Sequence, residues 1–211
     1  SQMTPENIIA KAIEKNLSII SITDHNRISN SITAVNIAEG KEDLLVVPGI
    51  EISTTQGHLL SYFPTTQDLE NFYGKLNFNP DKTFSTQGIY ECLEYVKKYN
   101  GFGILAHIEV DSGFEQTIGK FNEIFDLAFQ HPSIFALEIK NHESVDFYTQ
   151  DDNNPDRKHA MKKRNQSLGL PDSYKLAKVM SSDAHSMNAF GKNASGADRL
   201  TRFKLDELSF D

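Results

Sequence analysis

The stretch LLVVPGIEIS, residues 44–53, decides the fold of this chain. Its apolar and β-branched residues predict a buried strand over residues 44–52. Glu51 interrupts that strand, and a buried carboxylate is costly unless it is paired or coordinated. GHLLSYF, residues 57–63, follows at once and predicts a second strand, with His58 beside its apolar run. The two stretches together indicate a polar site built on a sheet.

Other short apolar runs carry the same kind of residue at their ends. They are SIISITDHN (18–26), GFGILAHI (101–108) and LAKVMSSDAH (176–185). The candidate site residues are therefore His25, Glu51, His58, His107, Asp183 and His185. The strand ends of a parallel barrel converge on one face, so residues far apart in the sequence can meet there. Imidazole suits zinc, iron or manganese, and carboxylate can bridge two ions. The pattern predicts a metal cluster that makes hydroxide and grips phosphate.

Each histidine alone is weak support, because a lone buried histidine is more often a hydrogen-bonded core residue than a ligand. Four of the seven histidines lie at predicted strand ends, and this clustering favours metal. Asp183 and His185 are two residues apart, which places both side chains on one face of an extended chain. The other three histidines lie in loop or helix contexts and are expected at the surface: His131, His142 and His159.

Composition narrows the class of protein. The chain has 211 residues, 38% of them hydrophobic, which is enough for one sizeable core. The net charge of −8 disfavours a general nucleic-acid binder, since phosphate contacts need clustered Lys and Arg. The one cysteine, Cys92, is expected to be a buried thiol rather than a nucleophile, and a reducing compartment fits it. No apolar run reaches the length of a membrane span, so we expect a cytoplasmic protein.

Helical and strand patterns alternate along the chain. Helices are expected over residues 4–16, 29–39, 86–99, 114–130 and 155–167, and one short helix within 64–84. Strands are expected over residues 18–23, 44–52, 58–63, 102–106, 133–139, 175–181 and 200–205. This alternation predicts an α/β fold with a parallel sheet and right-handed crossovers. Seven strands suit a barrel better than a two-layer sheet. The charged stretch 151–165 is interpreted as a solvated loop and helix face rather than a phosphate-binding patch.

The motifs ITDHN, PGIEIS, GHLL, LAHI and SSDAH, in that order, resemble those of the PHP (polymerase and histidinol phosphatase) domain. The resemblance covers about residues 4–190. It implies a distorted, TIM-like (β/α)7 barrel with two or three divalent ions (Zn, Mn or Fe) that hydrolyses phosphoesters. It also implies the role of each candidate. Glu51 bridges two ions, His58 and His107 hold one of them, Asp183 helps to hold the other, and His25 and His185 hold a third. Asp24 orients a ligand, and Glu51 and Asp183 form the catalytic centre.

One family motif has no counterpart. The family's His-x-His pair on the first barrel strand, and a further His in the loop after it, are expected before Ser1. Either a segment with this strand and its three ligands precedes the chain, which we favour, or the protein has lost them. We expect a seam between the strand at 18–23 and the strand near Leu200. The tail SGADRLTRFKLDELSFD (195–211) resembles the stretch that links PHP domains to an SMC-like ATPase. The expected organisation is a phosphoesterase domain over residues 1–194 and a tail, 195–211, that leads to an ATPase domain.

Three functions fit these observations. The favoured one is a metal-dependent phosphoesterase that acts as a nuclease coupled to an ATPase in the same polypeptide. The second is a catalytically silent PHP module with a structural or regulatory role. The third is a small-molecule phosphatase of the histidinol-phosphatase type. The expected partner is a phosphoester substrate, nucleic acid in the favoured case, and no membrane.

Overall fold

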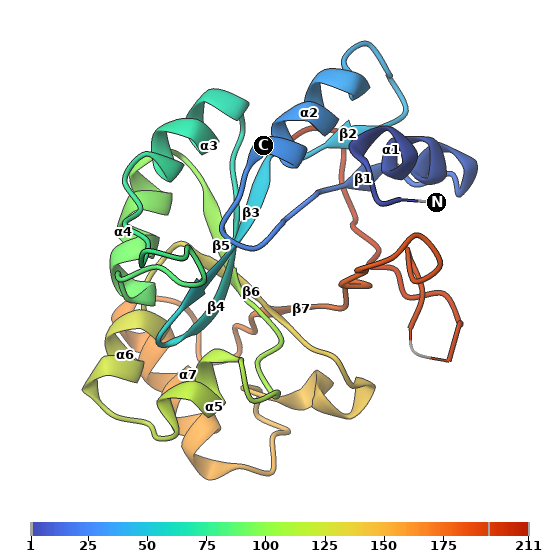
Figure 1. Cartoon of the computed structure of the whole chain (residues 1–211). Helices are drawn as coiled ribbons and strands as arrows, with labels where there is room; N and C mark the ends of the chain where they lie inside the picture. Colours follow the sequence, from blue (N-terminus) through green and yellow to red (C-terminus); the bar gives the residue numbers. More distant parts are fainter. Residues whose placement is uncertain (1, 194, 211) are drawn as a thin grey trace.

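Strands and helices alternate along most of the chain in the computed structural model, which describes residues 2–193 and 195–210 (Figure 1). The elements in chain order are α1 (Pro5–Glu14), β1 (Ile19–Ile20), α2 (Ser29–Ala38), β2 (Leu45–Val46), β3 (Gly49–Thr54), β4 (Gly57–Tyr62), α3 (Thr66–Tyr73), α4 (Ile89–Lys98), β5 (Phe102–Leu105), α5 (Phe114–Ile118), α6 (Glu123–Phe129), β6 (Ile134–Glu138), the 3-10 turn η1 (His142–Asp146), α7 (Pro155–Ser167) and β7 (Ala177–Val179). The predicted α/β class is confirmed.

The strands form a five-stranded sheet, in the order β3-β4-β5-β6-β7, and a parallel pair, β1-β2. The strand predicted over residues 44–52 is divided into β2 and β3 at Pro48, which has no N–H to donate to a ladder. Pairing nevertheless continues past β1. Glu51 N–H donates to the Asp24 carbonyl, and Asn26 N–H donates to the Glu51 carbonyl. The segment that ends at His25 therefore lies along β3 and joins the two sheets.

β4 runs antiparallel to both of its neighbours, so the prediction of a wholly parallel sheet is wrong. A tight turn between Thr54 and Gly57 connects β3 to β4, and Gly57 adopts a left-handed φ of 104°. A side chain there would lie 2.7 Å from the backbone of Phe114, so both the turn and the packing require glycine. Because β4 is reversed, its first residues lie at the same sheet edge as the last residues of β3 and β5. His58 reaches the site from the start of its strand.

The predicted closed barrel does not form among residues 2–193 and 195–210. Within these residues β1 pairs with β2, β7 pairs with β6, and the other edge of each strand has no strand partner. The strand predicted over residues 200–205 is absent, although Thr201 exchanges hydrogen bonds with the backbone of Met180 just after β7. The open side of the sheet thus lies between β1 and β7.

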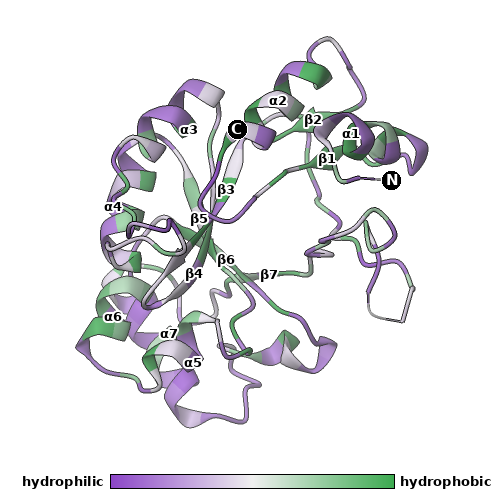
Figure 2. Ribbon diagram, viewed as in Figure 1, coloured by the Kyte–Doolittle hydropathy of each residue, from purple (hydrophilic) through white to green (hydrophobic). Residues whose placement is uncertain are grey.

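Helices α3 to α7 lie over one face of the five-stranded sheet, and α1 and α2 pack beside β1 and β2 (Figure 1). Figure 2 shows hydrophobic residues along the central strands and hydrophilic residues along α7. The main core lies between the sheet and these helices, and it contains Ile89, Leu93, Val96 and the predicted buried Cys92. On the opposite face, a smaller apolar cluster, Leu60, Ile104, Ala106 and Ala136, lies below the site residues. No helix among the described residues is long and apolar enough to cross a membrane.

Two helix predictions differ from the structure in detail. Thr4 caps α1 as expected, and Ile8, Ile9 and Ala12 are buried, but Ile13 is 49% exposed at the end of the apolar stripe. The helix predicted over 114–130 is two helices, because Gly119 takes a left-handed φ of 70° and ends α5. The side chain of Asn122 then caps α6.

Two predictions of surface exposure are wrong. His131 is buried, whereas His142 and His159 are exposed as expected. Arg164, within the stretch predicted to be solvated, is buried, and its guanidinium donates to the carbonyls of Phe129, His131 and Ile134. Since neither side chain faces solvent, both belong to the frame that joins α7 and α4 to the start of β6.

Candidate metal centre

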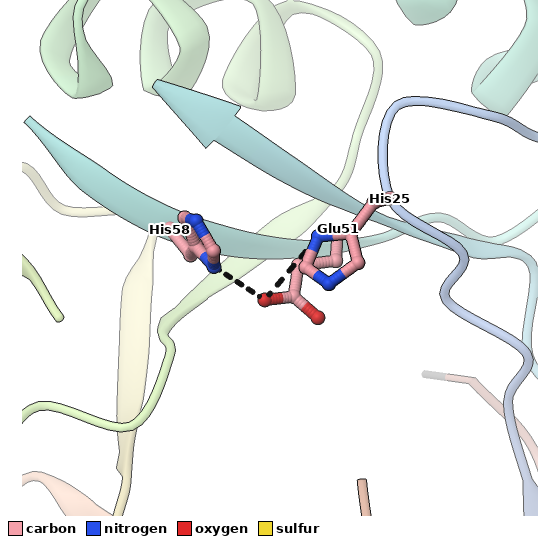
Figure 3. Close-up of side chains that lie close together, drawn as sticks. All are labelled: His25, Glu51 and His58. Carbon is pink, nitrogen blue, oxygen red and sulfur yellow. Dashed lines mark hydrogen bonds and ion pairs between the residues drawn. The ribbon is translucent and has the colours of Figure 1, made fainter. Parts of the chain in front are cut away.

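Glu51 lies between two histidines at one edge of the sheet. Its Oε1 is 2.9 Å from His58 Nδ1 and 3.9 Å from His25 Nδ1. One ligand atom from each of the three residues lies within 4.8 Å of the others. Figure 3 shows the carboxylate projecting between the two imidazole rings. A buried carboxylate with two imidazoles is a donor set that binds zinc, manganese or iron.

Local structure fixes this arrangement. In the β3–β4 ladder Glu51 pairs with Leu60 and Ser53 pairs with His58, so the side chains of Glu51, Ser53 and His58 share one face. His25 is placed next to β3 by the parallel bridge between His25 and Glu51. The Ser53 hydroxyl lies 3.1 Å from His25 Nδ1, which helps to set the orientation of that ring.

Asn26 holds the end of the His25 segment. It is buried with a left-handed φ of 53°, and its side-chain amide donates to the carbonyls of Lys82 and Thr83. Its side-chain oxygen accepts from the backbone N–H of Ser53. These bonds tie the His25 turn to β3 and to the loop that precedes α4. Asp24 was expected to orient a metal ligand. In the structure its carboxylate accepts a hydrogen bond from the side-chain amide of Asn30 rather than from a site histidine.

His107 extends the group on the β4 side. Its ring centroid is 5.1 Å from that of His58, in an edge-to-face arrangement. The Glu138 Oε2 accepts from the His107 backbone N–H at 2.9 Å and lies 3.3 Å from His107 Nδ1. His107 Nε2 is buried and has no hydrogen-bond partner. A buried nitrogen without a partner is costly in an apolar core, and here it lies beside other donor groups.

Asp183 and His185 extend the group from His25. The rings of His25 and His185 are stacked with centroids 6.4 Å apart, and His185 Nε2 is 3.5 Å from Asp183 Oδ1. The other Asp183 oxygen accepts from Lys140 Nζ at 2.6 Å. Asp183 therefore stands between a histidine of the group and a lysine that follows β6.

The six predicted residues thus form one continuous series of side-chain contacts, but they do not share a single centre. Three of them, His25, Glu51 and His58, lie around a common point. His107 is in contact through His58, and Asp183 is in contact through His185. Asp183 forms its ion pair with Lys140, on the far side of His185 from Glu51 in this series of contacts.

Three of the seven non-glycine residues with positive φ among the described residues lie at the site. Asn26, His107 and Asp183 are non-glycine residues with φ of 53°, 32° and 45°. A left-handed φ is unfavourable for residues with a Cβ, and such residues gather at functional sites where the surrounding contacts hold them. Asn26 follows the His25–Glu51 bridge, and His107 and Asp183 follow β5 and β7 within a few residues. At these three positions the surrounding contacts hold the backbone in a conformation that non-glycine residues rarely adopt.

Two charged residues of the site were missed in the sequence. Glu138 ends β6 and is 2% exposed, and Lys140 follows it. The signal was available, since FALEIK (135–140) places a carboxylate within an apolar strand just as PGIEIS does. Ser181, which donates to the Glu138 carboxylate, carried no comparable signal because a serine in a loop is common.

Charge balance in the site keeps two carboxylates ionised. Burial raises the pKa of Glu138, but hydrogen bonds from His107 and Ser181 and the charge of Lys140 outweigh it, so this pKa is below its ordinary value. Burial also raises the pKa of Asp183, and the hydrogen bond and charge of Lys140 reverse that effect, so the pKa is again lowered. The site therefore presents negative charge to a cation.

Comparisons with known proteins agree with a phosphoesterase fold. No protein-family profile matches the chain. An uncharacterized protein of Methanocaldococcus jannaschii is 30% identical over 103 residues, and the match spans about half of each chain (49% of this one and 51% of the relative). The lesion-specific endonuclease PfuEndoQ of Pyrococcus furiosus aligns with a TM-score of 0.60 at 16% identity, over 91% of this chain and 46% of that one.

A third comparison covers nearly the whole of both chains. A Bifidobacterium adolescentis structure, described provisionally as a metal-dependent phosphoesterase, aligns with a TM-score of 0.53 at 14% identity over 93% of this chain and 87% of that one. At such identities the similarity establishes the fold alone. The chain has an α/β fold of the kind found in metal-dependent phosphoesterases and in endonuclease Q, with a His and Glu group where a metal could bind.

Proposed function

We propose that this protein is a metal-dependent phosphoesterase. The observation that carries the proposal is the buried Glu51 carboxylate between His25 and His58, beside the unpartnered Nε2 of His107. Carboxylate and neutral imidazole are ligands for zinc, manganese and iron, and a bridging carboxylate suits a centre with more than one ion. The fold shared with metal-dependent phosphoesterases supports the same chemistry.

In this proposal the chain's own residues have separate roles. The residues that would hold two or three divalent ions are His25, Glu51, His58, His107, Asp183 and His185. Bound ions would lower the pKa of a water molecule and stabilise the charge on phosphoryl oxygens. Lys140 would add a positive charge at the rim of the site, since its ammonium group already lies against Asp183. Glu51 and Asp183 are the proposed catalytic carboxylates.

Nucleic acid is the proposed substrate class. The support is the similarity of the fold to a lesion-specific endonuclease and the resemblance of residues 195–211 to a link toward an SMC-like ATPase. The net charge of −8 gives no general affinity for phosphate backbones, so binding would depend on the metal centre or on an attached domain. A small phosphate ester is the alternative substrate, and a silent regulatory module is the alternative without catalysis.

The open side between β1 and β7 supports one further part of the proposal. Both strands have an edge without a strand partner in the described residues, and exposed edges favour pairing with another strand. We propose that a strand bearing His-x-His occupies this position in the complete polypeptide. It would supply ligands next to Asp183 and His25, the two residues that flank the gap.

The test is metal analysis followed by hydrolysis assays on the complete natural polypeptide. We expect about two or three equivalents of Zn, Mn or Fe, loss of hydrolysis after chelation and recovery after metal is restored. Single-stranded DNA, double-stranded DNA and a phosphate monoester are compared as substrates. Faster cleavage of DNA supports a nuclease, and faster release from the monoester supports a small-molecule phosphatase. Bound metal without hydrolysis of any of the three supports the silent module, and a protein that binds no metal contradicts the proposal.

A further inference from the structure

Both oxygens of the Glu138 carboxylate are in contact with residues beside the site. One oxygen, Oε2, accepts from the backbone N–H of His107 and faces Nδ1 of the same residue. The other oxygen, Oε1, accepts from the hydroxyl of Ser181. With Glu138 on β6, His107 after β5 and Ser181 after β7, one carboxylate joins the ends of three neighbouring strands. The side chain is 3% exposed, so water does not compete for these bonds.

The contacts determine which nitrogen of His107 carries the proton. A carboxylate that accepts from two donors acts as an acceptor toward Nδ1 as well, so Nδ1 must carry hydrogen. The remaining nitrogen, Nε2, then has a free lone pair. A hydrogen on Nε2 would be a buried donor without an acceptor, which is unfavourable. The geometry therefore selects the tautomer with hydrogen on Nδ1.

We propose that Glu138 is a positioning residue that holds His107 in the Nδ1–H tautomer and directs its Nε2 lone pair into the metal centre. The metal part of this statement rests on the proposed function, whereas the tautomer does not. Carboxylates that hold metal-binding imidazoles in this way raise the basicity of the ligand and fix its ring. Through Ser181, the same carboxylate also sets the start of the loop that carries Asp183.

The protein contains a built-in reference for the experiment. His131 is a second buried histidine with a carboxylate partner, Glu94, at 2.7 Å from its Nε2. Its Nδ1 accepts from the backbone N–H of Ser133, so the hydrogen must lie on Nε2. His107 and His131 are thus expected to be opposite tautomers, and only His107 contacts the site. Glu94→Ala is the matched control for Glu138→Ala.

The test combines nitrogen-15 NMR of the histidine rings in metal-free protein with calorimetric titration of zinc. In the unaltered protein we expect His107 as the Nδ1–H tautomer and His131 as the Nε2–H tautomer. Glu138→Ala should mix the tautomers of His107 and weaken zinc binding about 10- to 100-fold. Glu94→Ala should change only the His131 signals and leave zinc affinity unaltered. Glu138→Gln should restore the tautomer, because its amide oxygen can face the two N–H groups while Ser181 accepts from its NH2.

Several outcomes overturn the proposal. Hydrogen on Nε2 of His107 in the unaltered protein does so, as does an unchanged His107 tautomer in a folded Glu138→Ala protein. If Glu138→Ala does not fold, Glu138→Gln decides: zinc affinity that follows the His107 tautomer, unaltered where Nδ1–H is retained and weakened where it is lost, supports the role, and zinc affinity that is independent of the tautomer overturns it. If the unaltered protein binds no zinc, manganese or iron, the proposed function fails, while the tautomer measurement still decides the role of Glu138.

Discussion

At the scale of single residues, Glu51 is the side chain whose replacement tests the proposed chemistry most directly. Glu51→Gln keeps the size of the side chain but removes the charge that faces His25 and His58. We expect hydrolysis in the complete protein to fall by at least about 10- to 100-fold, the range typical of residues that only support a ligand. The measurements are kcat/KM, metal content and circular dichroism.

A matched control is available on the surface of α3, where Glu70 is exposed. Glu70→Gln makes the same chemical change away from the site and should leave both hydrolysis and metal content as they are. Unaltered turnover by a Glu51→Gln protein with full metal content would show that Glu51 does not bridge the ions.

His131 provides a second prediction at this scale, which concerns pH and stability. Burial lowers the pKa of His131, and the hydrogen bond with Glu94 only partly opposes it, so the folded state favours the neutral ring. The pKa is higher in the unfolded state, so protonation favours unfolding. The contribution to stability is complete above about pH 6.5 and is lost as the pH falls through the range below it. Urea unfolding at pH 7.5 and 5.5 should show this loss in the unaltered protein and a smaller one in His131→Asn, with equal losses contradicting the assignment.

Three of the candidate residues, His25, Glu51 and His58, gather as a possible metal group, whereas the surroundings of the candidates were harder to predict. Glu51 could be identified because a carboxylate in an apolar strand needs a partner. Glu138 follows the same rule, and its pattern was overlooked. His131 was expected at the surface because it precedes a proline in a loop, but burial of a loop residue depends on what packs over it. Here Arg164 of α7 packs against His131, and its guanidinium donates to the His131 carbonyl.

At the scale of elements, a buried arginine of α7 is hydrogen-bonded to the backbone around the start of β6. The guanidinium of Arg164 donates to three backbone carbonyls at 2.6 to 2.8 Å. No carboxylate among the described residues forms an ion pair with it. Arg164→Met keeps the length of the stem and removes this donor from the carbonyls of Phe129 and Ile134, whereas the His131 carbonyl still accepts from the Ile134 N–H. Each unsatisfied buried group costs about 1–3 kcal/mol. For two such carbonyls we expect the free energy of unfolding to fall by about 2–6 kcal/mol, measured by urea denaturation.

Lys162→Met on the exposed side of the same helix is the control, and its effect on stability should be within about 0.5 kcal/mol. If the two variants are equally stable, Arg164 does not anchor α7. Because α7 packs in the main core, on the face of the sheet opposite to Glu51 and His58, a folded Arg164→Met protein should retain the zinc affinity of the unaltered protein.

The direction of β4 shows which element-scale features could have been predicted. Five residues separate the strands predicted over 44–52 and 58–63, and only two separate the observed β3 and β4, whereas a parallel connection needs a crossover of a dozen or more. An antiparallel hairpin was therefore the only possible connection, and loop length would have identified it. The break between α5 and α6 was harder, because glycine within a helical pattern is tolerated about as often as it ends a helix.

At the scale of the whole molecule, a bound metal should stabilise the fold. An ion that binds only the folded state adds about 2.7 kcal/mol when its free concentration is 100 times Kd. For a chain of this size that corresponds to a rise in Tm of roughly 5–10 °C. Scanning calorimetry with zinc or manganese should show the rise in the unaltered protein and its loss in His58→Gln. An equal rise in both proteins would indicate binding elsewhere.

The sequence predicted the α/β class and the edge at which the site lies, but it did not predict how the sheet closes. Periodicity reports which residues are buried, and closure depends on the pairing of strands that are distant in the chain. The run at 200–205 has the composition of a strand, yet Thr201 is hydrogen-bonded to the backbone of Met180 through its side chain, and no ladder follows among the described residues. A strand needs a neighbour with a free edge in the correct register, and sequence composition does not specify one.

The β3–β4 hairpin has a consequence for the order in which the protein folds. Glu51 and His58 are seven residues apart, whereas 31 residues separate His107 from Glu138 and 43 separate Lys140 from Asp183. Hairpins form in about 1–10 μs, and distant pairings form more slowly because long loops must close first. One half of the centre can thus assemble as soon as a short segment has folded. The other half must wait for the last strands, so a nascent chain carries a carboxylate–imidazole pair before it can complete the site around it.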